Sequence, residues 1–97
     1  MKQLSDYTFY NSWQLNELNL KQGSDYLILE DLGDMRKGQV VSFAGFDDVD
    51  NHYGIFVFTD PAGRIMEVKG DFSSSESYKL IELKRAIKFL KDPGDRR

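Results

Sequence analysis

The sequence predicts a single α+β domain: a small bent antiparallel sheet or barrel of four to five strands, a C-terminal amphipathic helix, and a short N-terminal helical or extended lid. Three observations predict this class. Short runs rich in β-branched and aromatic residues fill positions 24–71, and polar turn segments separate them. An apolar stripe with helical spacing follows over positions 73–91. The length of 97 residues suits one modest core, so we expect residues 1–97 to form one domain with a frayed tail over 92–97.

The N-terminal segment is rich in aromatic residues. Asn11 or Ser12 could cap a short helix that carries Leu15 and Leu18. Four aromatic side chains lie before this helix or at its start: Tyr7, Phe9, Tyr10 and Trp13. Two interpretations stay open. The segment folds back as a lid over one end of the barrel, or it binds a partner, because aromatic residues are enriched at interface hot spots.

Three strands are expected in the first part of the sheet. The first, Tyr26–Glu30, is short and apolar, and a turn-like segment from Asp31 to Asp34 follows it. The second, Gln39–Phe46, is rich in valine and phenylalanine. The third, Tyr53–Thr59, is apolar at successive positions, which is typical of a central strand covered on both faces.

The fourth strand, Arg64–Lys69, alternates between apolar and charged side chains, as a strand with one buried face does. The four residues before it, Asp60-Pro61-Ala62-Gly63, carry a turn signal. Proline presets φ for the first central position of a type I turn, and glycine accepts the left-handed residue that closes it. The third and fourth strands are therefore expected to form a hairpin.

Glycines recur near the ends of the predicted strands, where a tight barrel must bend or turn. They are Gly38, Gly45, Gly54, Gly63 and Gly70. Together with the strands, this pattern over residues 24–71 resembles the SH3-like small barrels. The resemblance implies a fold only. The chain has neither an ALYDY-like segment nor paired tryptophans, so the recognition of proline-rich peptides is not implied.

The C-terminal helix is expected to begin at Ser73, which would form a capping box with Glu76. Its buried face is an apolar stripe that consists of Leu80, Leu83, Ala86, Ile87 and Leu90. The sequence Asp92-Pro93-Gly94 stops the helix. The other face carries Tyr78, Ile81 and Phe89, although a helix packed on one side should be polar there. We expect either the N-terminal aromatic residues or another chain to cover these three side chains, and isolated exposure is the remaining alternative.

The residues most suggestive of chemistry form the run Asp47-Asp48-Val49-Asp50-Asn51-His52. A calcium-binding EF-hand needs oxygen ligands at loop positions 1, 3 and 5 and glycine at position 6, and no register of this run supplies them. The single histidine, without a nucleophile motif or a second histidine, predicts neither a catalytic set nor a multi-histidine metal site. The run is therefore expected to be a polar turn, and we predict no catalytic, cofactor or metal site.

The charge is unevenly distributed along the chain. Residues 1–78 hold 13 acidic and 6 basic side chains, a balance of −7, whereas residues 79–97 hold 3 acidic and 7 basic ones, a balance of +4. The acidic part repels polyphosphates, so nucleic acid is not the expected partner. No apolar run reaches the roughly 20 residues of a membrane span, and the first residues do not read as a signal peptide. We therefore expect no membrane contact and a cytoplasmic location.

These features favour a small non-enzymatic protein-interaction module of the adaptor or antidote type. Its partner would be another protein or a second copy of the chain, bound through the aromatic N-terminal segment, the unusual helix face, or both. The alternative is a nucleic-acid- or ribosome-associated small barrel that acts through its basic C-terminal helix. The cations of that helix are Lys79, Lys84, Arg85, Lys88 and Lys91.

Overall fold

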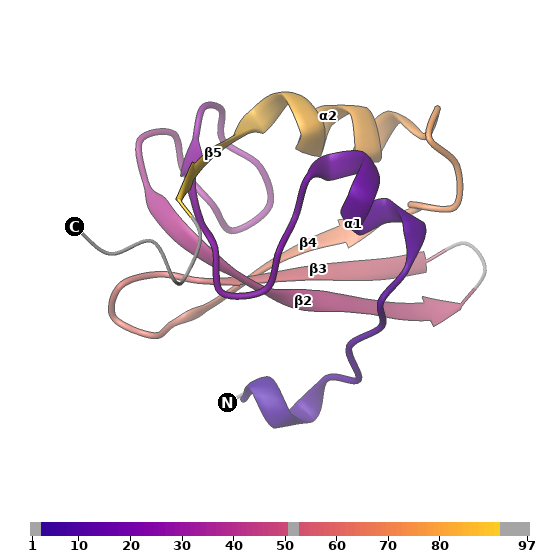
Figure 1. Cartoon of the computed structure of the whole chain (residues 1–97), viewed down its shortest axis with the longest axis horizontal. Helices are drawn as coiled ribbons and strands as arrows, with labels where there is room; N and C mark the ends of the chain where they lie inside the picture. The colour runs from indigo at the N-terminus through magenta and orange to yellow at the C-terminus, as the bar shows by residue number, and fades with distance from the viewer. Residues whose placement is uncertain (1–2, 51–52, 92–97) are drawn as a thin grey trace.

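The computed structural model describes residues 3–50 and 53–91, which form a five-stranded antiparallel sheet with two α-helices on one side and a short N-terminal 3-10 helix on the other (Figure 1). In chain order the elements are the 3-10 helix η1 (Leu4–Asp6), α1 (Trp13–Leu18), β1 (Asp25–Ile28), β2 (Val40–Asp50), β3 (Tyr53–Thr59), β4 (Ile65–Gly70), α2 (Tyr78–Ala86) and β5 (Ile87–Lys91). The expected α+β class is confirmed. The short helix at the N-terminus is confirmed as well. Ser12 occupies its N-cap position, but the Ser12 side chain makes no capping hydrogen bond.

The strands are arranged in the order β4-β3-β2-β1-β5, and every neighbouring pair is antiparallel. The four expected strands are present, and the β3–β4 hairpin forms around the Asp60–Gly63 turn. In the part of the chain that the structure describes, β4 and β5 are the two edges and are not paired with each other. Strand pairing therefore leaves the sheet open and does not close it into a barrel.

The loop between β1 and β2 crosses to the β4 edge. The amide of Asp34 donates to the carbonyl of Glu67 at 3.3 Å, and the amide of Glu67 donates to the carboxylate of Asp34 at 3.1 Å. Gly33 has φ of +58°, and a Cβ there would lie 2.5 Å from the Glu67 carbonyl oxygen. Only glycine allows this close approach. The loop thus covers the middle of an edge strand, whose backbone groups would otherwise face solvent.

The expected helix over 73–91 is wrong at both ends. Helix α2 begins at Tyr78 after Ser77, so Ser73 and Glu76 form no capping box. It ends at Ala86, and the next residues form β5, which pairs with β1 from Ile28–Ile87 to Asp25–Lys91. As a strand, residues 87–91 form backbone hydrogen bonds with the free edge of β1. They could not form these bonds if the helix continued. The expected frayed tail over 92–97 lies outside the described residues.

One face of the sheet carries the main core, beneath α1 and α2. Leu80, Leu83 and Ala86 of α2 are buried against it, as the helical stripe predicts. The remainder of that stripe is corrected: Ile87 is only partly buried and Leu90 is exposed, because both belong to β5. The other members of this core come from α1, the sheet and the loops, and they are Leu18, Leu20, Tyr26, Ile28, Leu32, Met35, Val41, Phe43, Phe46, Phe56, Phe58, Met66, Val68 and Phe72.

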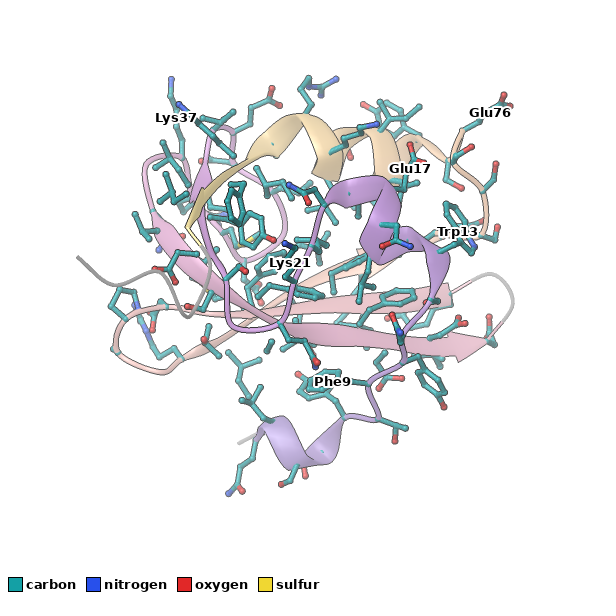
Figure 2. All side chains as sticks on the ribbon, in the orientation of Figure 1. Phe9, Trp13, Glu17, Lys21, Lys37 and Glu76 are labelled. Atoms are coloured by element: carbon teal, nitrogen blue, oxygen red, sulfur yellow. The ribbon has the colours of Figure 1, made fainter. Side chains whose placement is uncertain are left out.

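The opposite face of the sheet carries a second, smaller apolar cluster. Tyr7, Ile55 and Val57 are buried there, and Phe9 packs against them. Figure 2 shows Phe9 on the other side of the sheet from Trp13 and Glu17. Strand β3 is therefore covered on both faces, as its continuous apolar run predicts, and it lies between β2 and β4.

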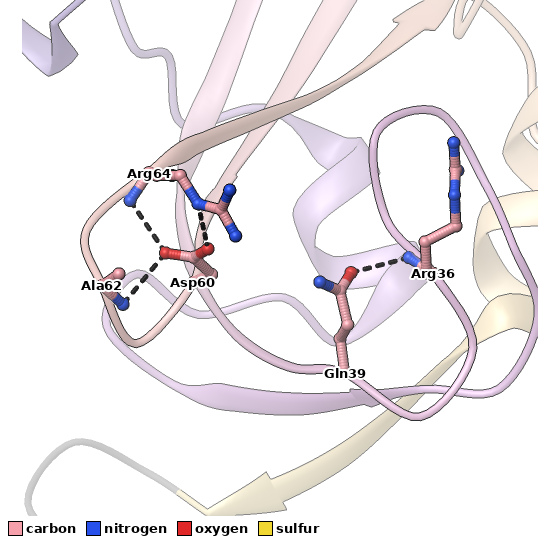
Figure 3. A network of polar contacts seen from close by, with 5 residues as sticks. All are labelled: Arg36, Gln39, Asp60, Ala62 and Arg64. Carbon is pink, nitrogen blue, oxygen red and sulfur yellow. Dashed lines mark hydrogen bonds and ion pairs between the residues drawn. The ribbon is translucent and has the colours of Figure 1, made fainter.

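The Asp60–Gly63 turn is organised by one carboxylate (Figure 3). Asp60 Oδ1 accepts from the amides of Ala62 at 3.0 Å and Arg64 at 2.8 Å, and Oδ2 accepts from Arg64 Nε at 2.8 Å. In the β1–β2 loop, the amide of Arg36 likewise donates to Gln39 Oε1 at 2.7 Å. The hydrogen bond from the Arg64 amide, helped by the Arg64 side chain and the Ala62 amide, lowers the pKa of Asp60 below its ordinary value.

The turn gives a pH-dependent prediction. A carboxyl whose pKa is lowered by folding stabilises the native state above its ordinary pKa, and this stabilisation is lost as the pH falls through the lowered value. We expect Asp60→Asn to be less stable than the unmodified chain near about pH 7, and the difference to shrink towards about pH 2. Urea unfolding at both pH values checks this. An equal difference at both would show that the charge of Asp60 is not what stabilises the turn.

Candidate binding site

Two of the aromatic residues expected to bind a partner lie in the second core. Tyr7 is 9% exposed, and its ring stacks on that of Phe9 with centroids 5.8 Å apart. The Tyr7 hydroxyl donates to Glu67 Oε2, and burial, followed by this carboxylate, raises the pKa of the phenol. A Cβ at Gly45 would overlap the Phe9 ring, so the ring lies directly on the β2 backbone. These contacts are those of a lid, one of the two interpretations left open by the sequence.

The other two N-terminal aromatic residues are accessible. Tyr10 is 47% exposed, although its amide donates to the carbonyl of Phe46 at 2.9 Å and so ties this part of the chain to β2. Trp13 is the first residue of α1 and is 44% exposed. The aromatic segment is thus divided: its first half covers the sheet, and its second half presents rings to solvent.

The three residues expected on the outer face of a long helix are not all on one helix. Tyr78 and Ile81 lie on α2, with exposures of 74% and 47%. Phe89 lies on β5, paired with Tyr26 of β1, and its ring meets that of Tyr26 edge-on at 5.7 Å. The N-terminal aromatic residues Tyr7 and Phe9 pack on the sheet rather than on α2. Tyr7 and Phe9 therefore do not cover the outer face of α2.

The acidic run is mostly strand rather than turn. Strand β2 continues to Asp50, which pairs with Tyr53, so the expected turn is wrong for residues 47–50. The remainder of the expected turn, Asn51 and His52, lies outside the described residues. Because side chains alternate along a strand, the run divides between the two faces of the sheet. Asp47 accepts a long hydrogen bond of 3.4 Å from the amide of Thr8 in the lid, whereas Asp48 and Asp50 both line a pocket beside the start of α1. The register of β2 against β3 shifts between Asp47 and Asp50, so alternation does not assign Asp50 to the face of Asp48.

A pocket of about 140 Å³ lies where this end of the sheet meets the start of α1. Two acidic and four aromatic residues line it, together with a glutamine, a serine and a glycine. These residues are Trp13, Gln14, Phe46, Asp48, Asp50, Tyr53, Gly54, Phe72 and Ser73. No lysine or arginine is among the residues that line it in the described part of the chain.

Gln14 is the unusual member of this pocket, because it is only 5% exposed. Its Nε2 donates to the carbonyl of Phe72 at 2.7 Å, which fixes the orientation of the amide. Its Oε1 is buried and has no hydrogen-bond donor among the described residues. A buried polar atom without a partner is costly, and native proteins contain few of them.

A larger and more open groove of about 860 Å³ lies between η1 and the β3–β4 hairpin. Leu4, Tyr7 and Ile65 give it an apolar floor, and Arg64 and Glu67 lie at its sides. Both charged side chains already have partners, Asp60 for Arg64 and Lys69 for Glu67. The groove therefore offers apolar area without an unpaired charge that would specify a ligand.

Comparison of the chain with protein-family models, with curated proteins and with solved structures finds no match. Among the helices of the described residues, none has the length and apolar character needed to span a bilayer. Nor do the carboxylate side chains of residues 3–50 and 53–91 come together in a group of three that could hold a metal ion. The only histidine, His52, lies outside those ranges.

Sequence reasoning missed the pocket beside Trp13. Gln14 was one polar residue in a short helix, and Asp48 and Asp50 were parts of an expected turn. If β2 had been extended through Asp50, the alternation of side chains would have placed Asp47 and Asp48 on opposite faces. The face of Asp50 could not have been deduced in this way, because the register shifts between Asp47 and Asp50.

Proposed function

We propose that this domain is a small non-enzymatic protein-interaction module of the adaptor or antidote type, which binds a partner protein through the outer face of α2. The observation that carries the proposal is the exposure of Tyr78 and Ile81 on a helix whose inner face is buried. Residues three apart on a helix are neighbours, so these two side chains form one apolar patch. Tyrosine is enriched at interface hot spots because it buries a large area at low entropic cost.

The way in which α2 is held supports the same proposal. Lys84 is paired with Glu17 of α1 at 3.1 Å, and Arg85 is paired with Glu30 after β1 at 3.0 Å. Each exposed pair contributes little stability by itself, but the pairs fix the orientation of α2 together with its buried leucines. A surface that is already ordered loses less conformational entropy when a partner binds.

The same ion pairs weaken the alternative of nucleic-acid binding. Three of the five cations expected on the C-terminal helix have carboxylate partners, because Lys79 also lies 3.7 Å from Glu82. Lys88 and Lys91 belong to β5, so the five cations do not follow one helix face. A phosphate backbone would have to displace these carboxylates before the cations could neutralise it.

We also propose that the fold is an SH3-like small barrel and that the module acts in the cytoplasm. Two observations support the barrel. The last strand returns to pair with the first, and the β1–β2 loop meets the β4 edge through Asp34 and Glu67. The loop would then complete the side of the barrel that strand pairing leaves open.

The proposal is tested by placing a charge on the α2 patch. We expect Ile81→Asp to keep the native circular dichroism spectrum and to weaken partner binding or self-association about tenfold or more, because an unpaired charge is costly in a closed interface. Val40→Asp is the matched control, since Val40 is a similarly exposed apolar residue on β2. Light scattering measures self-association. A photo-crosslinking residue placed at position 78 identifies a bound protein, and the same residue placed at position 40 is the control. Equal behaviour of both variants, or no crosslink specific to position 78, would overturn the proposal.

A further inference from the structure

We propose that the outer edge of β5 binds an extended segment of a partner protein, which adds a strand to the sheet and carries the pattern apolar–acidic–apolar. This inference goes beyond the proposed function, which concerns the outer face of α2. The edge in question is formed by Ile87, Lys88 and Phe89, which follow the end of α2. A failure at one surface therefore leaves the other to be judged separately.

The two edges of the sheet are not equivalent. At the β4 edge, the β1–β2 loop occupies the middle of the strand, because Asp34 and Glu67 exchange hydrogen bonds. Within residues 3–50 and 53–91, β5 pairs with β1 alone, and no other segment forms a backbone hydrogen bond with it. A free edge is a template for the backbone of another chain. A further strand would therefore join the sheet at β5 rather than at β4.

The backbone direction of β5 follows from its ladder with β1. The amide of Leu29 donates to the carbonyl of Ala86 at 2.6 Å, so these residues form a hydrogen-bonded pair. Such pairs alternate with non-hydrogen-bonded pairs along an antiparallel ladder. Lys88 is therefore bonded to β1, and Ile87 and Phe89 are not. The amides and carbonyls of Ile87 and Phe89 consequently point to the free edge, where a partner strand can pair with them.

The side chains of the same three residues determine what the partner strand must carry. Ile87 and Phe89 lie opposite Ile28 and Tyr26 of the main core, and Phe89 is still 37% exposed. Lys88 lies between them and points to the other face. The register shift of this ladder comes only beyond the Tyr26–Phe89 pair, so alternation holds for all three. A partner strand would therefore place apolar side chains beside Ile87 and Phe89.

Lys88 specifies the residue between the two apolar ones. It is exposed and has no carboxylate partner among the described residues, whereas Lys84 and Arg85 of α2 are both paired. An acidic residue opposite Lys88 forms a favourable cross-strand pair. A second copy of the chain fits less well. If Ile87 of one copy faced Phe89 of the other, the two Lys88 side chains would lie opposite each other, which is destabilising.

The test is amide hydrogen exchange, measured by NMR on the full-length protein, with acetyl-Thr-Val-Glu-Val-Thr-amide as the probe. This sequence is palindromic, so it presents the same side chains in a parallel and in an antiparallel strand. In the free protein we expect the Lys88 amide, which is bonded to β1, to exchange slowly and the Phe89 amide to exchange fast. At a peptide concentration ten times its Kd, the Phe89 amide should exchange about tenfold more slowly.

Control peptides separate strand addition from charge alone. Acetyl-Thr-Pro-Glu-Pro-Thr-amide has the same charge, but its prolines lack the two amides that would pair with the edge. It should leave the exchange of the Phe89 amide unchanged. Acetyl-Thr-Val-Lys-Val-Thr-amide should bind about threefold more weakly than the glutamate peptide, because like charges opposite each other are destabilising.

Variants locate the site. Lys88→Glu should reverse the preference, so that the lysine peptide binds more tightly than the glutamate peptide. Lys37→Glu makes the same change of net charge at an exposed residue outside β5, and it should leave the preference unchanged. Four results would contradict the proposal: a Phe89 amide that exchanges slowly without peptide at every protein concentration, protection that grows with protein concentration alone, equal protection by the proline peptide, or the same peptide preference in both variants. The second result would identify another copy of the chain as the occupant.

Discussion

Phe56→Ala is expected to lower the free energy of unfolding by about 3–5 kcal/mol, a large part of the stability of a small domain. Phe56 has no exposed surface. Its ring stacks on that of Phe46 at 4.3 Å and meets that of Phe72 edge-on at 4.6 Å. Truncation would remove both contacts and leave a cavity beneath the helices, which the surrounding rings could fill only in part.

Urea unfolding followed by circular dichroism measures this loss, with Tyr53→Ala as the control on the same strand. Tyr53 is 38% exposed, so we expect its truncation to cost less than about 1 kcal/mol. Phe58 has no exposed surface either, and Phe58→Ala should resemble Phe56→Ala. A cost below about 1 kcal/mol for Phe56→Ala would mean that β3 is not the strand around which the main core closes.

Leu83→Ala is expected to lower the free energy of unfolding by about 2–5 kcal/mol, because Leu83 is fully buried between α2 and the sheet. Ile81→Ala is the matched control on the same helix, since Ile81 is 47% exposed, and it should cost less than about 1 kcal/mol. The same denaturation experiment measures both variants. If the two losses were equal, the outer face of α2 would be as important for folding as the inner face, and its proposed role in binding would fail.

Local sequence patterns predicted the elements whose partners are near in the chain. The β3–β4 hairpin followed from the turn residues Asp60–Gly63, and the burial of both faces of β3 followed from its continuous apolar run. The structure confirms both. In each case the decisive interactions lie within one hairpin or one strand, where turn chemistry and side-chain period determine the result.

The end of α2 could not be predicted in this way. Leu90 lies seven residues after Leu83, so helical spacing continues past the true helix end at Ala86. What ends the helix is the free edge of β1, where Phe89 pairs with Tyr26. Tyr26 belongs to the first strand of the sheet and Phe89 to the last. A pattern in the residues around Phe89 therefore cannot reveal this pairing. Tertiary context therefore overrides the helical propensity of the segment.

The same limit applies to the candidate sites. Accessible apolar residues were predicted from the N-terminal aromatic cluster and from the helical spacing, and Trp13, Tyr78 and Ile81 are accessible. Which aromatic residues form the lid could not be deduced, because the burial of Tyr7 depends on β3 and β4 beneath it. The pocket beside Trp13 combines a residue of α1 with residues at the end of β2. Their proximity exists only once the helix is packed on the sheet.

The pairing of the first strand with the last also bears on how the chain folds during its synthesis. A ribosome makes β1 early, but the strand that covers its outer edge, β5, emerges only after β2, β3, β4 and α2. During that interval the edge of β1 is open to other chains, which is a route to aggregation. Loop closure over most of the domain must precede the β1–β5 pairing, so this pairing is expected to be among the slowest steps. A pause in translation before Ile87 would prolong the vulnerable state, and rapid completion of β5 would end it.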